Sequence, residues 1–165
     1  MRIPHTAVRQ GLHDEHAYRA PKYAVALAIL SAPFAARVAA QAMQRWSPVP
    51  FLPPFGAFQG SALPYVILLP AQIAIFATML AVCWRLRIGA LRPRPRIGSW
   101  LIVAGGVYVA TMLARLTVGL TVPDAPAWFR SDISTIFHFV LALFVLVLAA
   151  YHRRAPRRTP EEKCS

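Results

Sequence analysis

The sequence predicts an all-α integral membrane protein, a four-helix transmembrane bundle whose N-terminus and C-terminus both lie in the cytoplasm. Of its 165 residues, 57% are hydrophobic, compared with about 45–50% in soluble domains. The excess is concentrated in four long runs, each long enough to cross a bilayer, between polar or proline-rich breaks. The basic residues gather in only three of the segments outside these runs, and this bias orients the helices.

The four apolar runs define the domain organisation. The predicted spans are residues 23–43, 63–84, 99–121 and 133–151. A polar segment, residues 1–22, precedes this transmembrane domain of residues 23–151, and a basic tail, residues 152–165, follows it. Pro33 and Pro70 lie inside spans, where a proline removes one helical hydrogen bond, so each is expected to bend its helix.

Residues 1–22 are polar, and Thr6–Tyr18 is expected to form a short surface helix. His13 and His16 are three residues apart and would share one face of that helix. No third ligand follows at a fixed spacing, so solvated histidines are favoured over a metal site.

The charge distribution gives the orientation. Four basic residues lie in the N-terminal segment, five in residues 85–98 and five in the C-terminal tail, whereas the other two connections have one each, Arg45 and Arg130. Positive-inside bias therefore places both termini and residues 85–98 in the cytoplasm. The net charge of +12 is assigned to topology and to attraction by anionic lipid rather than to nucleic-acid binding. The composition, rich in arginine, alanine and proline, suggests a bacterial inner membrane.

The two outward connections are rich in aromatic residues and proline. Residues 44–62 are expected to lie on the lipid headgroups, with a lid or a docking surface as the alternative. Residues 122–134 are expected to include a short interfacial helix that starts near Asp124. Small residues recur every fourth position in two spans and predict close helix packing there. These two seams are Ala28, Ala32, Ala36 and Ala40 in the first span, and Gly106, Ala110 and Ala114 in the third.

Each predicted span contains a polar residue at a similar depth, near the outward end. The residues are Arg37, Gln41, Gln72, Arg115 and His138. A charged side chain in hydrocarbon costs about 2.5–3.5 kcal/mol on insertion scales, so such residues usually face the bundle interior or a cavity. The simplest packing therefore brings these five side chains together beneath the two outward connections.

Three interpretations of this cluster are open. Asp132 pairs with one arginine while the glutamines bridge the rest, or both arginines reach out to the headgroups. In the functional interpretation, the two guanidinium groups bind a phosphate or carboxylate, and His138 acts as a donor or proton carrier. The ligand is then an anionic headgroup or a small anion.

A redox subunit is the alternative class. His138 and His152 are fourteen residues apart on one predicted helix, and that spacing suits two stacked haems. Each haem needs a further ligand from a facing helix, and Met79 and Met112 are the candidates in the second and third spans. A quinone needs only His138 and a few polar groups in an apolar cleft.

No catalytic motif is present: the chain has no nucleophile elbow, phosphate-binding loop or H-E-x-x-H sequence. Cys83 and Cys164 both fall on the predicted cytoplasmic side, where thiols stay reduced. The sequence therefore favours a small non-enzymatic membrane protein that binds an anion, or an accessory subunit or homo-oligomer that associates through its small-residue seams.

Overall fold

The computed structural model describes residues 5–58, 63–124, 126, 129 and 132–154, with the backbone alone for residues 5–20 and 132. All regular structure in this part of the chain is helical. The helices are α1 (His5–Trp46), α2 (Phe55–Phe58), α3 (Tyr65–Arg87), α4 (Pro95–Thr121) and α5 (Asp132–Arg153). All but α2 contain a stretch long and apolar enough to cross a membrane. The all-helical architecture with four long apolar helices that the sequence predicts is therefore present.

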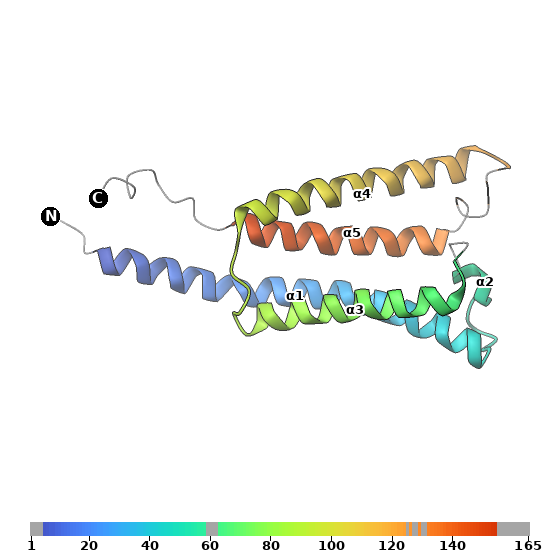
Figure 1. The fold of residues 1–165 in the computed structure, drawn as a ribbon, viewed down its shortest axis with the longest axis horizontal. Helices are drawn as coiled ribbons and strands as arrows, with labels where there is room; N and C mark the ends of the chain where they lie inside the picture. The colour runs from blue at the N-terminus through green and yellow to red at the C-terminus, as the bar shows by residue number, and fades with distance from the viewer. Residues whose placement is uncertain (1–4, 59–62, 125, 127–128, 130–131, 155–165) are drawn as a thin grey trace.

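The four long helices alternate in direction (Figure 1). The start of α1, the α3–α4 connection and the end of α5 lie toward one end of the molecule, whereas α2 and the start of α5 lie at the other. The arginine-rich connection thus shares an end with the beginning of the first helix and the end of the last. We refer to this as the basic end, and to the opposite one as the α2 end.

The first helix is longer than expected. Thr6–Tyr18 does not form a separate surface helix, because α1 runs without interruption from His5 to Trp46 through Pro21 and Pro33. Alanines on both sides of Pro21 favour helix strongly enough to continue it past the missing hydrogen bond. α3 likewise continues through Pro70. The side chains of His13 and His16 lie outside the described residues.

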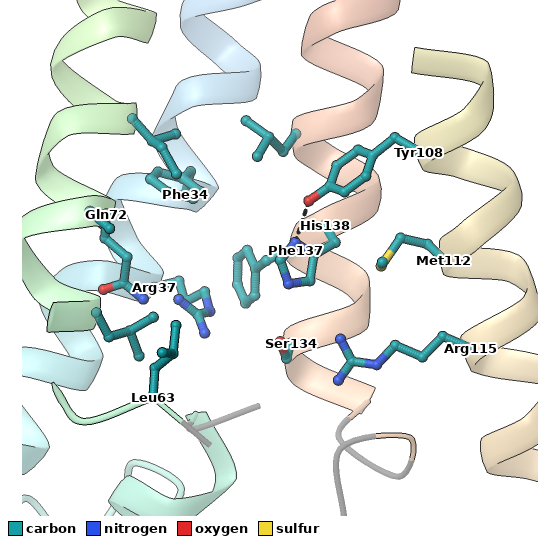
Figure 2. Close-up of a pocket in the computed structure, with 14 residues that line it drawn as sticks. Phe34, Arg37, Leu63, Gln72, Tyr108, Met112, Arg115, Ser134, Phe137 and His138 are labelled. Atoms are coloured by element: carbon teal, nitrogen blue, oxygen red, sulfur yellow. Dashed lines mark hydrogen bonds between the residues drawn. The ribbon is translucent and has the colours of Figure 1, made fainter. Parts of the chain in front are cut away.

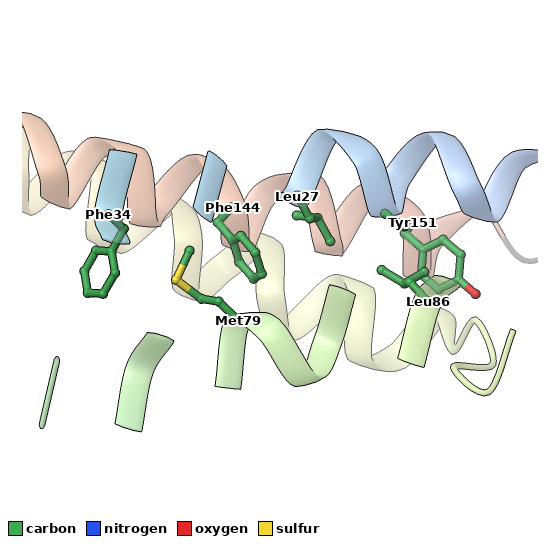
Figure 3. Packing of buried hydrophobic residues seen from close by; sticks show 7 residues of the cluster. Leu27, Phe34, Met79, Leu86, Phe144 and Tyr151 are labelled. Carbon is green, nitrogen blue, oxygen red and sulfur yellow. The ribbon is translucent and has the colours of Figure 1, made fainter. Parts of the chain in front are cut away.

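The helices pack in the order α3, α1, α5, α4. α1 contacts α3 and α5, and α4 contacts α5, whereas α3 and α4 make no contact within the described residues. Among the described residues, the buried members of the apolar core come from α1, α3 and α5 (Figure 3). Its central members are Leu27, Phe34, Met79, Leu86, Phe144 and Tyr151. α4 is therefore an outlying helix held by α5 alone, and the side between α3 and α4 is open.

Close packing of α4 on α5 depends on glycines that the sequence prediction did not select. A Cβ atom at Gly98 would lie 2.9 Å from the backbone nitrogen of Arg153, and one at Gly105 would lie 2.7 Å from Cδ2 of Leu146. By contrast, a Cβ at Gly106 would meet nothing within 4 Å. The predicted seam of Gly106, Ala110 and Ala114 is exposed, so it takes no part in the packing among the described helices and stays a prediction about association with another helix.

The α1 seam likewise faces away from the described helices, because Ala28, Ala32 and Ala36 are exposed and Ala40 is only partly buried. The buried face of α1 instead contains Leu27, Ser31 and Phe34, one position away. Small residues at every fourth position do not determine which of two neighbouring helix faces is buried. The larger apolar side chains decide it, because their burial contributes more free energy.

The basic end is held by the last turn of α5. The hydroxyl group of Tyr151 donates to the carbonyl oxygen of Leu91, and Nδ1 of His152 accepts a hydrogen bond of 3.1 Å from the backbone nitrogen of Arg94. Both residues are buried. The arginine-rich connection is therefore attached to α5 through its backbone, and the side chains of Arg92 and Arg94 remain exposed.

At the α2 end, one side chain organises the connection after α1. The buried amide of Gln44 donates to the carbonyl oxygens of Val49, Leu52 and Pro53, over 2.9 to 3.0 Å. The connection then forms α2, whose Phe58 is buried and which contacts α1 and α5. The interfacial helix expected near Asp124 falls mostly on residues outside the described set and stays a prediction; Asp124 and Phe129 themselves lie in turns.

Candidate functional site

The polar residues predicted to meet do lie together at the α2 end. Arg37, Gln72, Arg115 and His138, from four different helices, line one cavity of about 360 Å³. Gln41 is not part of the cavity lining; it is fully buried and accepts a hydrogen bond from Gln72. The positions follow from the alternating helix directions, because residues late in α1 and α4 reach the same level as residues early in α3 and α5 (Figure 1).

Arg37 is a buried cation on α1, with only 8% of its surface exposed. Its Nη2 donates a hydrogen bond of 2.8 Å to the carbonyl oxygen of Phe58 in α2, and its guanidinium lies 5.6 Å from the centre of the Phe137 ring. The Nε atom has no hydrogen-bond partner within the described residues. Arg37 thus contacts neutral groups there, a carbonyl and an aromatic face, and keeps donor capacity for a further acceptor.

Gln41 and Gln72 form a buried pair between α1 and α3. Nε2 of Gln72 donates to Oε1 of Gln41 over 3.1 Å. Nε2 of Gln41 and Oε1 of Gln72 have no hydrogen-bond partner within the described residues. This single hydrogen bond leaves one donor and one acceptor of the pair unsatisfied by the described residues. An unsatisfied buried polar group costs about 1–3 kcal/mol. The pair therefore links the helices and still offers hydrogen-bonding capacity at the cavity wall.

His138 on α5 is oriented by Tyr108 on α4. The Tyr108 hydroxyl lies 2.5 Å from Nδ1 of His138, and the two rings meet edge to face. When the hydroxyl donates, Nε2 of the neutral imidazole carries the proton and is a donor; in the other tautomer Nε2 is an acceptor. Tyr108 therefore holds the ring in place, and whichever of the two groups donates determines the role of Nε2.

Arg115 on α4 completes the cavity from the opposite side, and it is 2% exposed. Figure 2 shows the guanidinium groups of Arg37 and Arg115 pointing toward the centre from opposite sides, with Ser134, Phe137 and His138 between them. Among the described residues that line the cavity, none is acidic. The cavity thus presents two cations, a histidine and hydroxyl groups, which suits an acceptor-rich, negatively charged group.

The positions of Arg37 and Arg115 bear on one of the two structural interpretations of the cluster. The burial of both arginines is inconsistent with side chains that extend to the headgroups, as the snorkelling interpretation requires. The pairing of an arginine with Asp132 concerns a side chain outside the described set, so that interpretation stays open.

Sequence reasoning missed Tyr108, Ser134 and Phe58. A tyrosine in the middle of an apolar span resembles the aromatic residues that pack in any helix, and only its distance to His138 reveals its role. Phe58 contributes a backbone carbonyl, and backbone groups carry no sequence signal. The depth comparison could have included Ser134, because it precedes His138 by one helical turn.

The residues proposed for haem ligation are arranged differently from a two-haem site. His152 accepts at Nδ1 from the backbone of Arg94, so the proton of its neutral ring is on Nε2, and that nitrogen has no lone pair for iron. Met112 lines the same cavity as His138, whereas Met79 lies in the core. His138 with Met112 is the remaining ligand pair of this type.

Comparison of the chain with protein-family models, with curated proteins and with solved structures found no match. Function must therefore be argued from the site itself.

Proposed function

We propose that this chain is a small, non-enzymatic, multi-pass protein of the bacterial inner membrane that binds an anionic headgroup or a small anion at the cluster of Arg37, Gln41, Gln72, Arg115 and His138. One observation carries the proposal: two arginines from different helices, both more than nine-tenths buried, line the same cavity.

The energetics support a ligand. A buried guanidinium has lost its water, and a carbonyl contact such as that of Arg37 with Phe58 replaces only part of that hydration. An anion between the two arginines would provide charge-assisted hydrogen bonds, which are about twice as strong as neutral ones. The two donor groups face each other across Ser134 (Figure 2), so a phosphate or carboxylate between them could accept from both.

The orientation belongs to the same proposal. The basic end carries Arg85, Arg87, Arg92, Arg94 and Arg96 in and around one connection, and positive-inside bias assigns that end to the cytoplasm. The cluster then lies toward the outer leaflet, beneath the aromatic connection that includes α2. The exposed seam of Ala28, Ala32 and Ala36 is compatible with a further association, either a homo-oligomer or an accessory role in a membrane complex.

The proposal predicts weaker anion binding in arginine variants. The protein is placed in nanodiscs of uncharged lipid and titrated with inorganic phosphate and with dodecyl phosphate. Arg37→Gln and Arg115→Gln should each weaken the tighter-binding probe about tenfold, because a hydrogen bond to a charged group contributes about 1.5–3 kcal/mol. Acidic lipid that co-purifies with the protein should decrease in parallel, as measured by mass spectrometry.

Arg92→Gln is the matched control, since it removes an equal charge from an exposed position at the basic end and should leave binding unchanged. Undiminished binding of both probes in the Arg37→Gln/Arg115→Gln double variant would sink the proposal. Asp132→Asn tests the ion-pair interpretation: a structural partner of an arginine should lower stability when removed, whereas under our proposal phosphate binding is kept or strengthened.

A redox subunit is the second candidate, and the Tyr108–His138 pair is the observation that favours it. The pair offers an oriented imidazole beside Met112 for haem, or a hydrogen-bonding group for a quinone carbonyl. A visible spectrum of the purified protein separates the classes. A Soret band that disappears in His138→Ala would support haem and contradict our preferred function.

A further inference from the structure

The polar cavity continues into an apolar groove that runs toward the basic end. The groove has a volume of about 460 Å³ and shares Ile75, Tyr108 and Leu141 with the polar cavity. Its other walls are Ala74, Thr78, Met79 and Val82 of α3 and Phe144, Val145 and Leu148 of α5. The Thr78 hydroxyl is bonded to its own helix at Ala74, and the Tyr108 hydroxyl to His138, so the groove offers almost no free polar group.

The groove exists because α3 and α4 are held apart by their other partners. α3 packs on α1, and α4 packs on α5 through Gly98 and Gly105, while α3 and α4 do not touch within the described residues. Nothing from the described chain fills the space between them. In a bilayer this opening is lateral and faces the lipid, so a ligand can enter it from within the membrane.

The groove also has a suitable length. His138 in the polar cavity and Leu148 at the far end of the groove are ten residues apart on α5. The distance between them along the helix axis is therefore about 15 Å at 1.5 Å per residue. That is about half of a hydrocarbon core of ~30 Å, the depth of one leaflet. A molecule with its charged group between Arg37 and Arg115 would therefore have its apolar part along the groove, in the orientation of a lipid in one leaflet.

We propose that the ligand is an anionic membrane amphiphile, a lipid with a phosphate or carboxylate headgroup, and that one of its hydrocarbon chains lies in the α3–α4 groove. This inference rests on the proposed function and specifies its ligand class. The charge of the polar end favours an acidic lipid over an uncharged quinone.

The experiment compares an anion with and without a chain. Nanodiscs of uncharged lipid that contain the full-length protein are titrated with dodecyl phosphate and with inorganic phosphate. Thr78→Trp places a bulky ring in the groove, while Thr111→Trp is the control: Thr111 is also exposed, is also bonded to the carbonyl four residues earlier, and does not line either cavity. Because both variants sit in the same bilayer, partitioning of dodecyl phosphate into lipid affects them equally.

We expect Thr78→Trp to weaken dodecyl phosphate about tenfold and Thr111→Trp to leave it unchanged. The ring would exclude the hydrocarbon chain from the groove and so remove its apolar contacts; a tenfold loss of affinity corresponds to about 1.4 kcal/mol. Inorganic phosphate should bind the two variants equally. If instead Thr78→Trp leaves dodecyl phosphate binding intact while Arg37→Gln still weakens it, the groove inference is wrong and the anion site remains. If Arg37→Gln and Arg115→Gln weaken neither probe, both proposals fail.

Discussion

Single buried side chains connect segments that lie far apart in the chain. At the α2 end the amide of Gln44 binds three carbonyls of the following connection and accepts from the backbone nitrogen of Val49. At the basic end Tyr151 and His152 bind backbone groups of the α3–α4 connection. Irregular backbone near hydrocarbon must find its hydrogen bonds inside the protein, and these three side chains provide them.

Removal of the Gln44 amide should therefore loosen the connection above the site. We expect Gln44→Ala to lower the free energy of unfolding by about 2–4 kcal/mol, since it removes the two N–H donors that three carbonyls share and the acceptor of Val49, at about 0.5–1.5 kcal/mol per hydrogen bond, and leaves buried carbonyls unsatisfied. Thermal unfolding in detergent measures the loss, and limited proteolysis should detect faster cleavage within residues 47–54. Arg45→Ala changes an exposed neighbour and should alter neither the stability nor the cleavage rate. Equal stability of the two variants would contradict the role of Gln44 in holding the connection.

At the scale of helices, the approach of α4 to α5 depends on which glycine faces the partner. Gly98 has the backbone nitrogen of Arg153 and the carbonyl oxygen of Ala149 at 2.9 and 3.0 Å from the position of a Cβ. Ala149 and Ala142 of α5 are themselves fully buried. Small residues on both helices thus allow the backbones to approach, as is common between membrane helices.

Alanine substitutions at Gly98 and Gly106 should have opposite effects. Each gains up to about 1 kcal/mol of helix propensity, but the Gly98→Ala methyl group meets backbone atoms, which cannot move as a side chain does. Overpacking of about 1–3 kcal/mol should make Gly98→Ala less stable than the unmodified protein. Gly106→Ala meets nothing within 4 Å and should be neutral or stabilising. Equilibrium unfolding in mixed micelles compares the stabilities of the two variants with that of the unmodified protein. A stabilised Gly98→Ala would contradict the close packing of α4 on α5.

At the scale of the molecule, the helices form a row with one open side rather than a closed square. α1 and α5 are central and carry most of the buried residues, whereas α3 and α4 are lateral. Large exposed apolar side chains cover both lateral helices, among them Val66, Trp84, Trp100 and Leu120. Such a surface is suited to lipid contact, and the opening between α3 and α4 belongs to it.

Cysteine labelling tests the proposed orientation of the whole molecule. In a Cys83→Ala/Cys164→Ala background, Phe51→Cys places a thiol on the exposed connection before α2, and Arg92→Cys places one on the α3–α4 connection. A membrane-impermeant maleimide added to intact cells should label Phe51→Cys only, and lysis should make Arg92→Cys reactive. Labelling of Arg92→Cys in intact cells would reverse the orientation and move the cluster to the cytoplasmic leaflet.

The sequence alone predicted the number of long apolar helices, the bounds of α3, α4 and α5 to within a few residues and the level at which Arg37, Gln72, Arg115 and His138 lie, but it missed the start of α1 at His5. Length, hydropathy and helix direction are local properties, so counting residues along each span is enough to give depth.

Only the tertiary structure decided which face of each helix is buried. It showed that Leu27 and Gly105 face inward and Ala28 and Gly106 outward, that Tyr108 meets His138, and that α3 and α4 stay apart. These features depend on rotation about the helix axis and on the choice of neighbour. The spacing of small residues constrains the rotation of a helix about its axis only weakly, because a turn of about 100° brings the neighbouring position inward instead. The packing of large side chains such as Phe34 and Phe144 determines which face is buried. The groove follows from that choice of neighbours, so no stretch of sequence contains it.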